Sequence, residues 1–309
     1  MRALVTGGYG FVGSNLTRRL LAEGHDAAIL ARPESNPWRL ADGVDGLRVF
    51  HGDLLDENSL AEAFSAFRPD VVFHCAMSPG HPRDASQRTE MLAASALGTA
   101  NVLEAALRFA VERFVHLGSF LAYGRQSRQL AESSPVAPIT WRGAAKAAAS
   151  LWVQQFAAQT QLSAVELRLF SVYGPWEGAH RFIPALLESA LDDRPFPLLR
   201  GPLHDWVYVG DVVEACLRAA QADLLPGEVF NIGSGTLTSN EEVVEIARRV
   251  TGCKIAVNPG DYPASPVDAA SWQADISAAG ERLNWTPQHS LQRGLAGTFE
   301  WIRRQRGVL

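Results

Sequence analysis

Lysine is almost absent from this chain of 309 residues: Lys146 and Lys254 are the only lysines among its 28 basic residues. Tyrosine is also scarce, with five positions, namely Tyr9, Tyr123, Tyr173, Tyr208 and Tyr262. Both side chains serve proton-transfer chemistry when their pKa is shifted toward neutral pH. Because the two inventories are so short, each lysine and tyrosine can be weighed individually as a functional candidate.

Other shortages exclude whole classes of protein. The net charge is −5 and there is no block of basic residues, which argues against general nucleic-acid binding. No run of about 18 apolar residues is present, so we expect no membrane span. The first residues, MRALVTGG, read directly as a strand, so we expect no signal peptide and a cytoplasmic location.

Cysteine is rare as well. Cys75, Cys216 and Cys253 are isolated in apolar or mixed segments, which predicts reduced and mostly buried thiols. No Cys/His spacing typical of a zinc site occurs, and we expect no metal.

The first part of the chain alternates between strand and helix patterns. Helical patterns cover about 11–23, 59–67, 85–109 and 143–160, and short apolar strands separate them, at Ala3–Thr6, Ala27–Ala31, Leu47–Phe50, Val71–Cys75, Phe114–Leu117 and Val165–Leu169. Apolar strands with helical crossovers predict a parallel sheet covered on both faces. The fold class is therefore α/β, with a doubly wound (Rossmann) sheet over residues 1–174.

The regular alternation of strand and helix patterns ends after Gly174, where prolines become frequent. Helices are expected at about 183–191, 212–220, 240–250 and 291–304, with strands at Val229–Ile232 and Ile255–Val257. We predict a smaller substrate-binding region over residues 175–309, with some crossing of the chain between the two parts. The substrate then binds between this lobe and the carboxyl ends of the strands.

A glycine-rich turn joins the first strand to the first helix. Its spacing is G-x-x-G-x-x-G, at Gly7, Gly10 and Gly13. Glycines permit the tight bend, a close backbone approach to a pyrophosphate, and close helix–strand contact. The helix N-terminus then binds the anion. We predict a dinucleotide site whose contacts come from Gly7, Tyr9, Gly10, Phe11, Val12 and Gly13.

The ends of the next strands indicate which dinucleotide is bound. An acid that would accept hydrogen bonds from the ribose of NAD is absent after the second strand, and Arg32 stands there instead. Its guanidinium suits a phosphate, which favours NADP(H), with NAD(H) as the alternative. Arg39 is a second candidate for this phosphate contact. The alternative is that Arg32 is an ordinary surface arginine without a role in binding. Asp53 and Leu54 end the third strand near the expected adenine.

Ordered motifs along the chain resemble one family. Beyond the glycine turn, they are His74-Cys75-Ala76, the segment 98–105 (GTANVLEA), Leu117-Gly118-Ser119, the segment 167–175 (LRLFSVYGP), the segment 205–212 (DWVYVGDV), Phe230-Asn231-Ile232-Gly233 and the segment 283–287 (LNWTP). This pattern is similar to the extended short-chain dehydrogenase/reductase superfamily, in its NAD-dependent epimerase/dehydratase group that acts on nucleotide sugars.

The resemblance assigns roles to several residues. Ser119 corresponds to the hydroxyl that holds the substrate oxygen, and Lys146 to the lysine that binds the cofactor ribose. Further cofactor contacts are implied for Cys75, Ala76, Met77, Phe170 and Val172. Substrate contacts are implied for Ser78, Ser119, Ser171, Arg181, Arg200 and His204. Ser171 replaces an Asn of the group and His204 replaces an Arg, for which Arg200 or Arg181 compensates.

One catalytic residue of the resembled family is missing. Its tyrosine stands four residues before the lysine, where this chain has Arg142. Arginine does not donate a proton near pH 7, because its pKa lies above about 12. Either Arg142 binds an anionic substrate group or polarises a carbonyl, or it faces solvent in a protein without the family's activity. Tyr123 is the best alternative acid, followed by His81, His116 and His204.

Three functions follow from these observations. The first is an NADP(H)-dependent ketoreductase acting on a nucleotide-linked keto sugar or a related metabolite. The second is a redox-neutral nucleotide-sugar epimerase or dehydratase with tightly bound NAD(P). The third is a catalytically silent dinucleotide-binding protein. A small-molecule substrate and a homodimer formed through the helices at 85–109 and 143–160 are expected.

Overall fold

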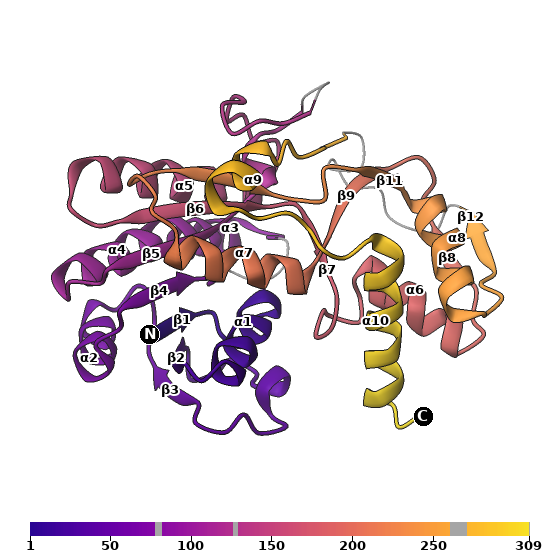
Figure 1. The fold of residues 1–309 in the computed structure, drawn as a ribbon, viewed down its shortest axis with the longest axis horizontal. Helices are drawn as coiled ribbons and strands as arrows, with labels where there is room; N and C mark the ends of the chain where they lie inside the picture. The colour runs from indigo at the N-terminus through magenta and orange to yellow at the C-terminus, as the bar shows by residue number, and fades with distance from the viewer. Residues whose placement is uncertain (78–81, 126–128, 260–270, 309) are drawn as a thin grey trace.

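The main sheet of the protein contains seven parallel strands in the order β10-β6-β5-β4-β1-β2-β3 (Figure 1). The computed structural model describes residues 1–77, 82–125, 129–259 and 271–308. The strands of this sheet are β1 (Arg2–Thr6), β2 (Asp26–Ala31), β3 (Arg48–His51), β4 (Val71–His74), β5 (Arg113–Ser119), β6 (Ala164–Leu169) and β10 (Val229–Ile232). The predicted doubly wound α/β fold is confirmed.

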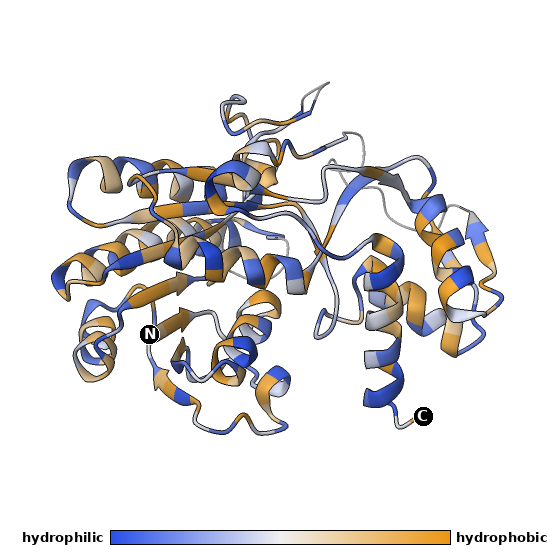
Figure 2. Ribbon diagram, viewed as in Figure 1, coloured by the Kyte–Doolittle hydropathy of each residue, from blue (hydrophilic) through white to orange (hydrophobic). Residues whose placement is uncertain are grey.

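Helices cover both faces of this sheet, because alternate residues of each strand are apolar on opposite sides. Ala3 and Val5 face the core formed with α1 (Phe11–Ala22), α7 (Val209–Gln221) and α9 (Ser277–Leu283). Leu4 faces the opposite core, formed with α2 (Glu57–Phe67), α4 (Gly98–Arg108) and α5 (Trp141–Gln159). Figure 2 shows the resulting mixture of apolar and polar residues along these helices.

The helix predicted at 85–109 is not uniform. It consists of α3 (Ala85–Leu92), a π-helical segment η2 (Ala93–Leu97) and α4. Two short 3₁₀ turns, η1 (Trp38–Leu40) and η3 (Phe120–Ala122), also escaped the sequence pattern. None of the helices in the described ranges is long and apolar enough to cross a membrane.

A second lobe has its own apolar core. It is formed mainly by α6 (Phe182–Leu191), α8 (Asn240–Thr251) and α10 (Leu291–Gln305). Two small sheets complete it, of which one has the order β11-β9-β7 and the other pairs β12 with β8. Their bounds are β7 (Ser171–Tyr173), β8 (Phe196–Leu198), β9 (Leu203–Tyr208), β11 (Leu237–Ser239) and β12 (Val257–Pro259). The strand predicted at Ile255–Val257 thus begins two residues later.

The chain does not divide cleanly after residue 174. After entering the second lobe it returns through α7 and β10, and β10 pairs with β6 in the main sheet. It returns once more through α9, which contacts β10 and α7 (Figure 1). The boundary at 174 therefore marks only the first of several crossings, because the edge position beside β6 is filled by a strand from the second half of the sequence.

Candidate active site

The expected site residues gather at the carboxyl ends of the parallel strands. Thr6 of β1 lies in register with Leu30 of β2 and His74 of β4, and Ser119 of β5 lies in register with Leu169 of β6. The segments that follow these strands begin at one edge of the sheet. In doubly wound folds this edge carries the ligand site.

The glycine turn has the geometry that a pyrophosphate requires. Gly7 has φ of +68°, and a Cβ there would lie 2.7 Å from Ala76 Cα. A Cβ on Gly13 would collide with the Gly7 carbonyl oxygen. Gly10 caps the N-terminus of α1 without a side-chain hydrogen bond. Backbone N–H groups at this terminus are therefore available to an anion, and the turn fits a dinucleotide.

Among the residues predicted to contact the adenosine, Arg32 has acidic partners within the protein. Its Nε lies 3.0 Å from Glu34 and its Nη1 lies 4.0 Å from Glu90. These two exposed carboxylates compete for the guanidinium, and their negative charge opposes a 2′-phosphate at this position. Asp53 Oδ1 accepts a hydrogen bond from Leu55 N, and Leu54 is fixed through its carbonyl by Asn101.

The Arg39 guanidinium is engaged by backbone carbonyl groups and is not free for a cofactor phosphate. Its Nη1 donates to the Tyr9 carbonyl at 3.2 Å, and its Nε donates to the Trp176 carbonyl at 2.7 Å. This arginine therefore ties the glycine turn to the segment that enters the second lobe.

Lys146 lies beneath the site, on α5. It is only 5% exposed, and its Nζ donates a hydrogen bond of 2.7 Å to the Leu117 carbonyl of β5. Burial lowers the pKa of Lys146 to about 8. Ser119, two residues after Leu117, ends β5, and its Oγ accepts from Leu121 N at 3.2 Å. The pair expected from the sequence therefore comes from adjacent elements, α5 and β5.

Arg142 begins the same helix, one turn before Lys146. Thr140 caps α5, and Arg142 and Lys146 are at positions i and i+4, so they share a face. Arg142 is half-buried rather than fully solvated. Burial lowers its pKa, and the positive charge of Arg181 acts in the same direction. Arg142 in turn lowers the pKa of Lys146, so Arg142 is coupled both to Arg181 and to Lys146.

Tyr123 does not qualify as a substitute proton donor. Its side chain is fully buried, and its hydroxyl donates a hydrogen bond of 2.6 Å to Asn231 Oδ1. The Arg168 guanidinium lies 4.7 Å from the ring centroid. Burial raises the pKa of Tyr123 to about 12. These contacts argue against the predicted role, because the residues after Ser119 form a 3₁₀ segment and the Tyr123 ring packs in an apolar cluster.

The histidines that were candidates for the proton donor, His116 and His204, also contact other rings of the protein. His116 is 1% exposed on β5 and is held neutral, because burial lowers its pKa well below the usual range. It stacks on His74, with ring centroids 5.4 Å apart. His204 lies on β9 and contacts Trp206, with ring centroids 5.1 Å apart. His81 and the predicted substrate residue Ser78 lie outside the described residues.

The remaining substrate candidates are spread along the second lobe. Ser171 on β7 is in register with Trp206 of β9, the strand that also carries His204. Arg181 caps α6 and lies 3.4 Å from Glu177. Arg200 is exposed in the β8–β9 connection.

The predicted cofactor contacts Cys75, Ala76, Met77, Phe170 and Val172 follow strands β4 and β6 in the chain. Burial raises the pKa of Cys75 to about 12, so this thiol is inert. Ala76 is close to Gly7, as described above, and Met77 is 40% exposed. Phe170 is buried against Phe120, and Val172 is half-buried on β7.

Sequence patterns missed a buried polar group behind the site. Glu166 and Arg168 of β6 are 1% and 2% exposed, and both bind Ser150 of α5. The sequence did contain a signal for this buried group, namely two charged residues, Glu166 and Arg168, within the otherwise apolar segment 164–169. Glu177 is a second omission: it is buried, and burial raises its pKa to about 7.

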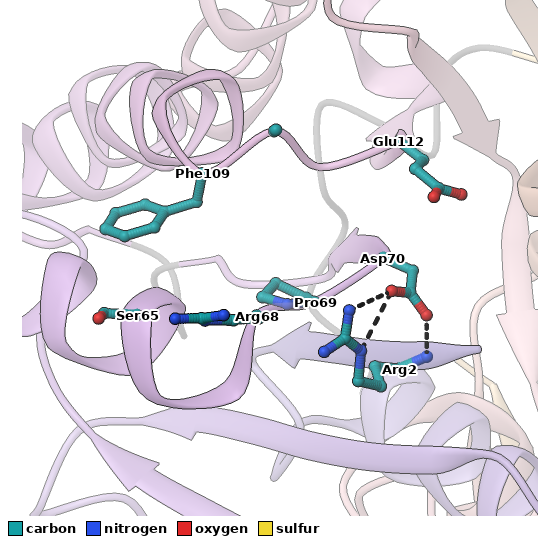
Figure 3. Close-up of a pocket in the computed structure, with 8 residues that line it drawn as sticks. Arg2, Ser65, Arg68, Pro69, Asp70, Phe109 and Glu112 are labelled. Carbon is teal, nitrogen blue, oxygen red and sulfur yellow. Dashed lines mark hydrogen bonds and ion pairs between the residues drawn. The ribbon is translucent and has the colours of Figure 1, made fainter.

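A hollow with a volume of about 430 Å³ lies elsewhere, at the amino ends of β1, β4 and β5 (Figure 3). It is lined by Arg2, Ser65, Arg68, Pro69, Asp70, Phe109, Ala110 and Glu112. Asp70 accepts two hydrogen bonds from the Arg2 guanidinium, at 2.7 and 3.1 Å. This hollow is at the edge opposite the glycine turn, and we do not assign it to the site.

Known proteins resemble the chain over nearly its whole length. Residues 3–233 match the model of the NAD dependent epimerase/dehydratase family. The chain belongs to this family. A UDP-glucose 4-epimerase of Mycolicibacterium smegmatis is 29% identical, covering 99% of both chains. A dTDP-glucose 4,6-dehydratase of Streptomyces niveus is 30% identical, covering 99% of this chain and 94% of its own.

Among solved structures, MoeE5 in complex with UDP-glucuronic acid and NAD is 32% identical to this chain. The match has a TM-score of 0.87 and covers 99% of this chain and 100% of the other. An epimerase/dehydratase family member with this architecture is expected to be an enzyme that uses a nicotinamide dinucleotide.

Proposed function

We propose that this protein is a redox-neutral, NAD-dependent epimerase or dehydratase acting on a nucleotide sugar. The observation that carries the proposal is the placement of Lys146 and Ser119 on adjacent elements at the carboxyl edge of the sheet, beside a glycine turn shaped for a pyrophosphate. The relatives named above include both an epimerase and a dehydratase. The proposal therefore favours this activity over a ketoreductase, which the sequence alone put first.

The residues would bind the cofactor and orient the substrate. The N-terminus of α1 would hold the pyrophosphate, and the Lys146 ammonium would hold the ribose. NAD, when bound, supplies reversible hydride chemistry. Ser119 Oγ would donate a hydrogen bond to the reacting substrate oxygen. Arg142 would bind an anionic or polarised substrate group, because its charge is fixed at neutral pH.

We propose NAD rather than NADP as the cofactor. MoeE5 was solved with NAD, and the carboxylates of Glu34 and Glu90 beside Arg32 disfavour a further phosphate at that position. NADP is the competing cofactor, and calorimetric titration of the protein, freed of bound nucleotide, with NAD and with NADP separates the two. Affinity for NADP tenfold or more above that for NAD would contradict the proposal.

The deciding experiment starts from the purified protein. Denaturation and chromatography of the released nucleotide should yield NAD in an amount comparable to that of protein. Incubation with UDP-glucose, UDP-glucuronic acid and dTDP-glucose, without added cofactor, should then convert one substrate to an epimer or a 4-keto-6-deoxy product. Oxidation of added NADPH by a keto-sugar nucleotide would support the ketoreductase, whereas NAD binding without any turnover would support a silent protein.

We further propose a homodimer formed through α4 and α5. Large apolar side chains are exposed on these helices and on the adjoining α3–η2 segment: Leu92, Leu97, Leu107, Trp141, Leu151 and Trp152. Exposed apolar groups of this size favour a protein interface. Sedimentation should give twice the 33.5 kDa chain mass. Trp152→Glu and Leu151→Glu should give a monomer, with Leu225→Glu, exposed on the α7–β10 connection, as the control.

A further inference from the structure

A charged cluster is buried between α5 and the main sheet, behind the site. Ser150 Oγ donates a hydrogen bond of 2.5 Å to Glu166 Oε2, and Arg168 Nη2 donates one of 2.9 Å to Ser150 Oγ. Arg168 Nε lies 3.4 Å from the same carboxylate oxygen. One oxygen of Glu166 is therefore engaged by both a hydroxyl and a guanidinium.

The other oxygen, Glu166 Oε1, is buried and has no hydrogen-bond partner among the described residues. It lies over Gly118 of β5, where an added Cβ would overlap it. The neighbouring residue, Leu117, is the one whose carbonyl accepts the Lys146 hydrogen bond. Hence the unengaged carboxylate oxygen and the ammonium group approach the same short piece of β5. Lys146 lies one helical turn before Ser150 on α5, and Ser150 is the residue that donates a hydrogen bond to Glu166 of β6.

The other titratable groups around Lys146 do not supply a negative charge. Besides Glu166, four titratable groups interact electrostatically with Lys146: Cys75 after β4, His74 on β4, His116 on β5 and Arg142 on α5. The Cys75 thiol stays protonated because burial raises its pKa to about 12. Burial keeps both histidines neutral, and lowers the pKa of His74 to about 3. Arg142 adds a positive charge.

We propose that Glu166 is a positioning residue for Lys146: its buried carboxylate keeps the ammonium group charged and directed at the cofactor edge, offsetting the positive charge of Arg142. The inference rests on the proposed function only for the role of Lys146 at the cofactor. The charge balance itself is a property of the protein without ligand.

The physical need for such a carboxylate follows from burial. Desolvation and the nearby Arg142 both favour the neutral amine of Lys146, and Glu166 opposes them. Burial also raises the pKa of Glu166, while Arg168, Ser150 and Lys146 favour its ionised form. A neutral Lys146 would lose the ion–dipole contact with the ribose hydroxyl groups. A chain with arginine at position 142 therefore depends on an anion behind the lysine.

The scarcity of lysine makes a direct test practical. Lysine labelled with ¹³C at Cε gives two NMR signals, from Lys146 and the exposed Lys254, and Lys254→Arg assigns them. We expect Lys146 to titrate near pH 8 in the natural sequence. In Glu166→Gln its midpoint should fall by on the order of one pH unit or more. In Arg142→Met it should rise, and Lys254 should not move in either variant.

Glu245→Gln, at an exposed position on α8, is the matched control and should leave both signals in place. An unchanged Lys146 midpoint in a folded Glu166→Gln variant overturns the proposal. Should that variant not fold, Glu166→Leu combined with Arg168→Met replaces the buried pair by apolar groups, a change that such pairs often tolerate. It must lower the Lys146 midpoint as well, or the proposal fails.

Cofactor affinity provides a second readout. The NAD dissociation constant, measured from pH 6 to 9, should rise on the alkaline side as Lys146 loses its proton. Glu166→Gln should move this rise to lower pH without changing affinity at pH 6, where the lysine is charged in both proteins. A uniform loss of affinity at all pH values would indicate a purely structural role and contradict the proposal. If NAD does not bind at all, the proposed function fails, while the NMR titration still decides the role of Glu166.

Discussion

The hydroxyl of Tyr123 donates a hydrogen bond of 2.6 Å to Asn231, which links the segment after β5 to the returning strand β10. Asn231 Nδ2 donates in turn to the Leu130 carbonyl at 2.9 Å. The tyrosine that the sequence offered as a replacement acid is thus committed to a structural contact. Its removal should act on stability and leave proton transfer alone.

Tyr123→Phe should lower the free energy of unfolding by about 1–3 kcal/mol, because Asn231 Oδ1 is left buried without its donor. The measurement is urea denaturation of the protein without ligand, at pH 7. The pH dependence of turnover should keep its shape. A variant of normal stability whose activity loses one limb of its pH profile would restore Tyr123 as a proton donor.

Arg142→Tyr should create an acid four residues before Lys146. We expect kcat for a neutral nucleotide sugar such as UDP-glucose to rise by roughly 100-fold or more, a typical contribution of general acid–base catalysis. Arg142→Phe, with the same ring but no hydroxyl, is the control and should not gain activity. A fall in kcat for the tyrosine variant would show instead that the substrate contact proposed for Arg142 contributes more to turnover than the added acid.

Glu177 predicts a pH-dependent stability. Burial raises its pKa to about 7 from an ordinary value of 4.5, so between these values the folded protein holds a proton that the unfolded chain releases. Stability due to this group is therefore present below pH 4.5 and lost as pH rises to about 7, by about 3 kcal/mol.

Glu177→Gln should remove this slope and stabilise the protein above pH 7. Urea midpoints at pH 5, 6, 7 and 8 measure the effect, and Glu245→Gln, at an exposed position, is the control. Parallel curves for Glu177→Gln and the natural sequence would mean that Glu177 is already ionised at pH 5.

Gly13→Ala should reduce NAD affinity at least tenfold, a loss of about 1.4 kcal/mol, because the methyl group would collide with the Gly7 carbonyl and distort the turn. Gly280→Ala is the matched control, since its Cβ would lie 3.9 Å from the nearest atom, the Trp285 carbonyl oxygen. Calorimetric titration of NAD into both variants makes the comparison. Equal affinities would remove the glycine turn from the binding site.

The sequence predicted the main sheet well because its strands are short, apolar and separated by amphipathic helices. The glycine turn was equally clear, since its spacing reflects a close backbone approach that Gly7 and Gly13 confirm. The prediction at 85–109 missed the π-helical segment, because one inserted residue per turn leaves the local composition helical.

The motifs led to Lys146 and Ser119, which lie on the adjacent elements α5 and β5, and their roles at the site stay predictions. The buried polar group behind them was not predicted. The cluster of Glu166, Arg168 and Ser150 depends on the register between β5 and β6 and on the rotation of α5, and neither is encoded within a short segment. Tyr123 failed as a candidate for the same reason: its distance along the chain was right, and its direction was set by contacts with β10.

The return of the chain through α7 and β10 has a consequence for how this protein can be altered. A chimera that joins the first lobe of this protein to the second lobe of a relative at residue 174 would not keep the main sheet of either protein intact. A fragment ending at residue 174 would lack β10, the outer strand that pairs with β6. It would also lack α7, which covers one of the two apolar cores of the main sheet. Substrate preference must therefore be redesigned one side chain at a time, within the intact chain.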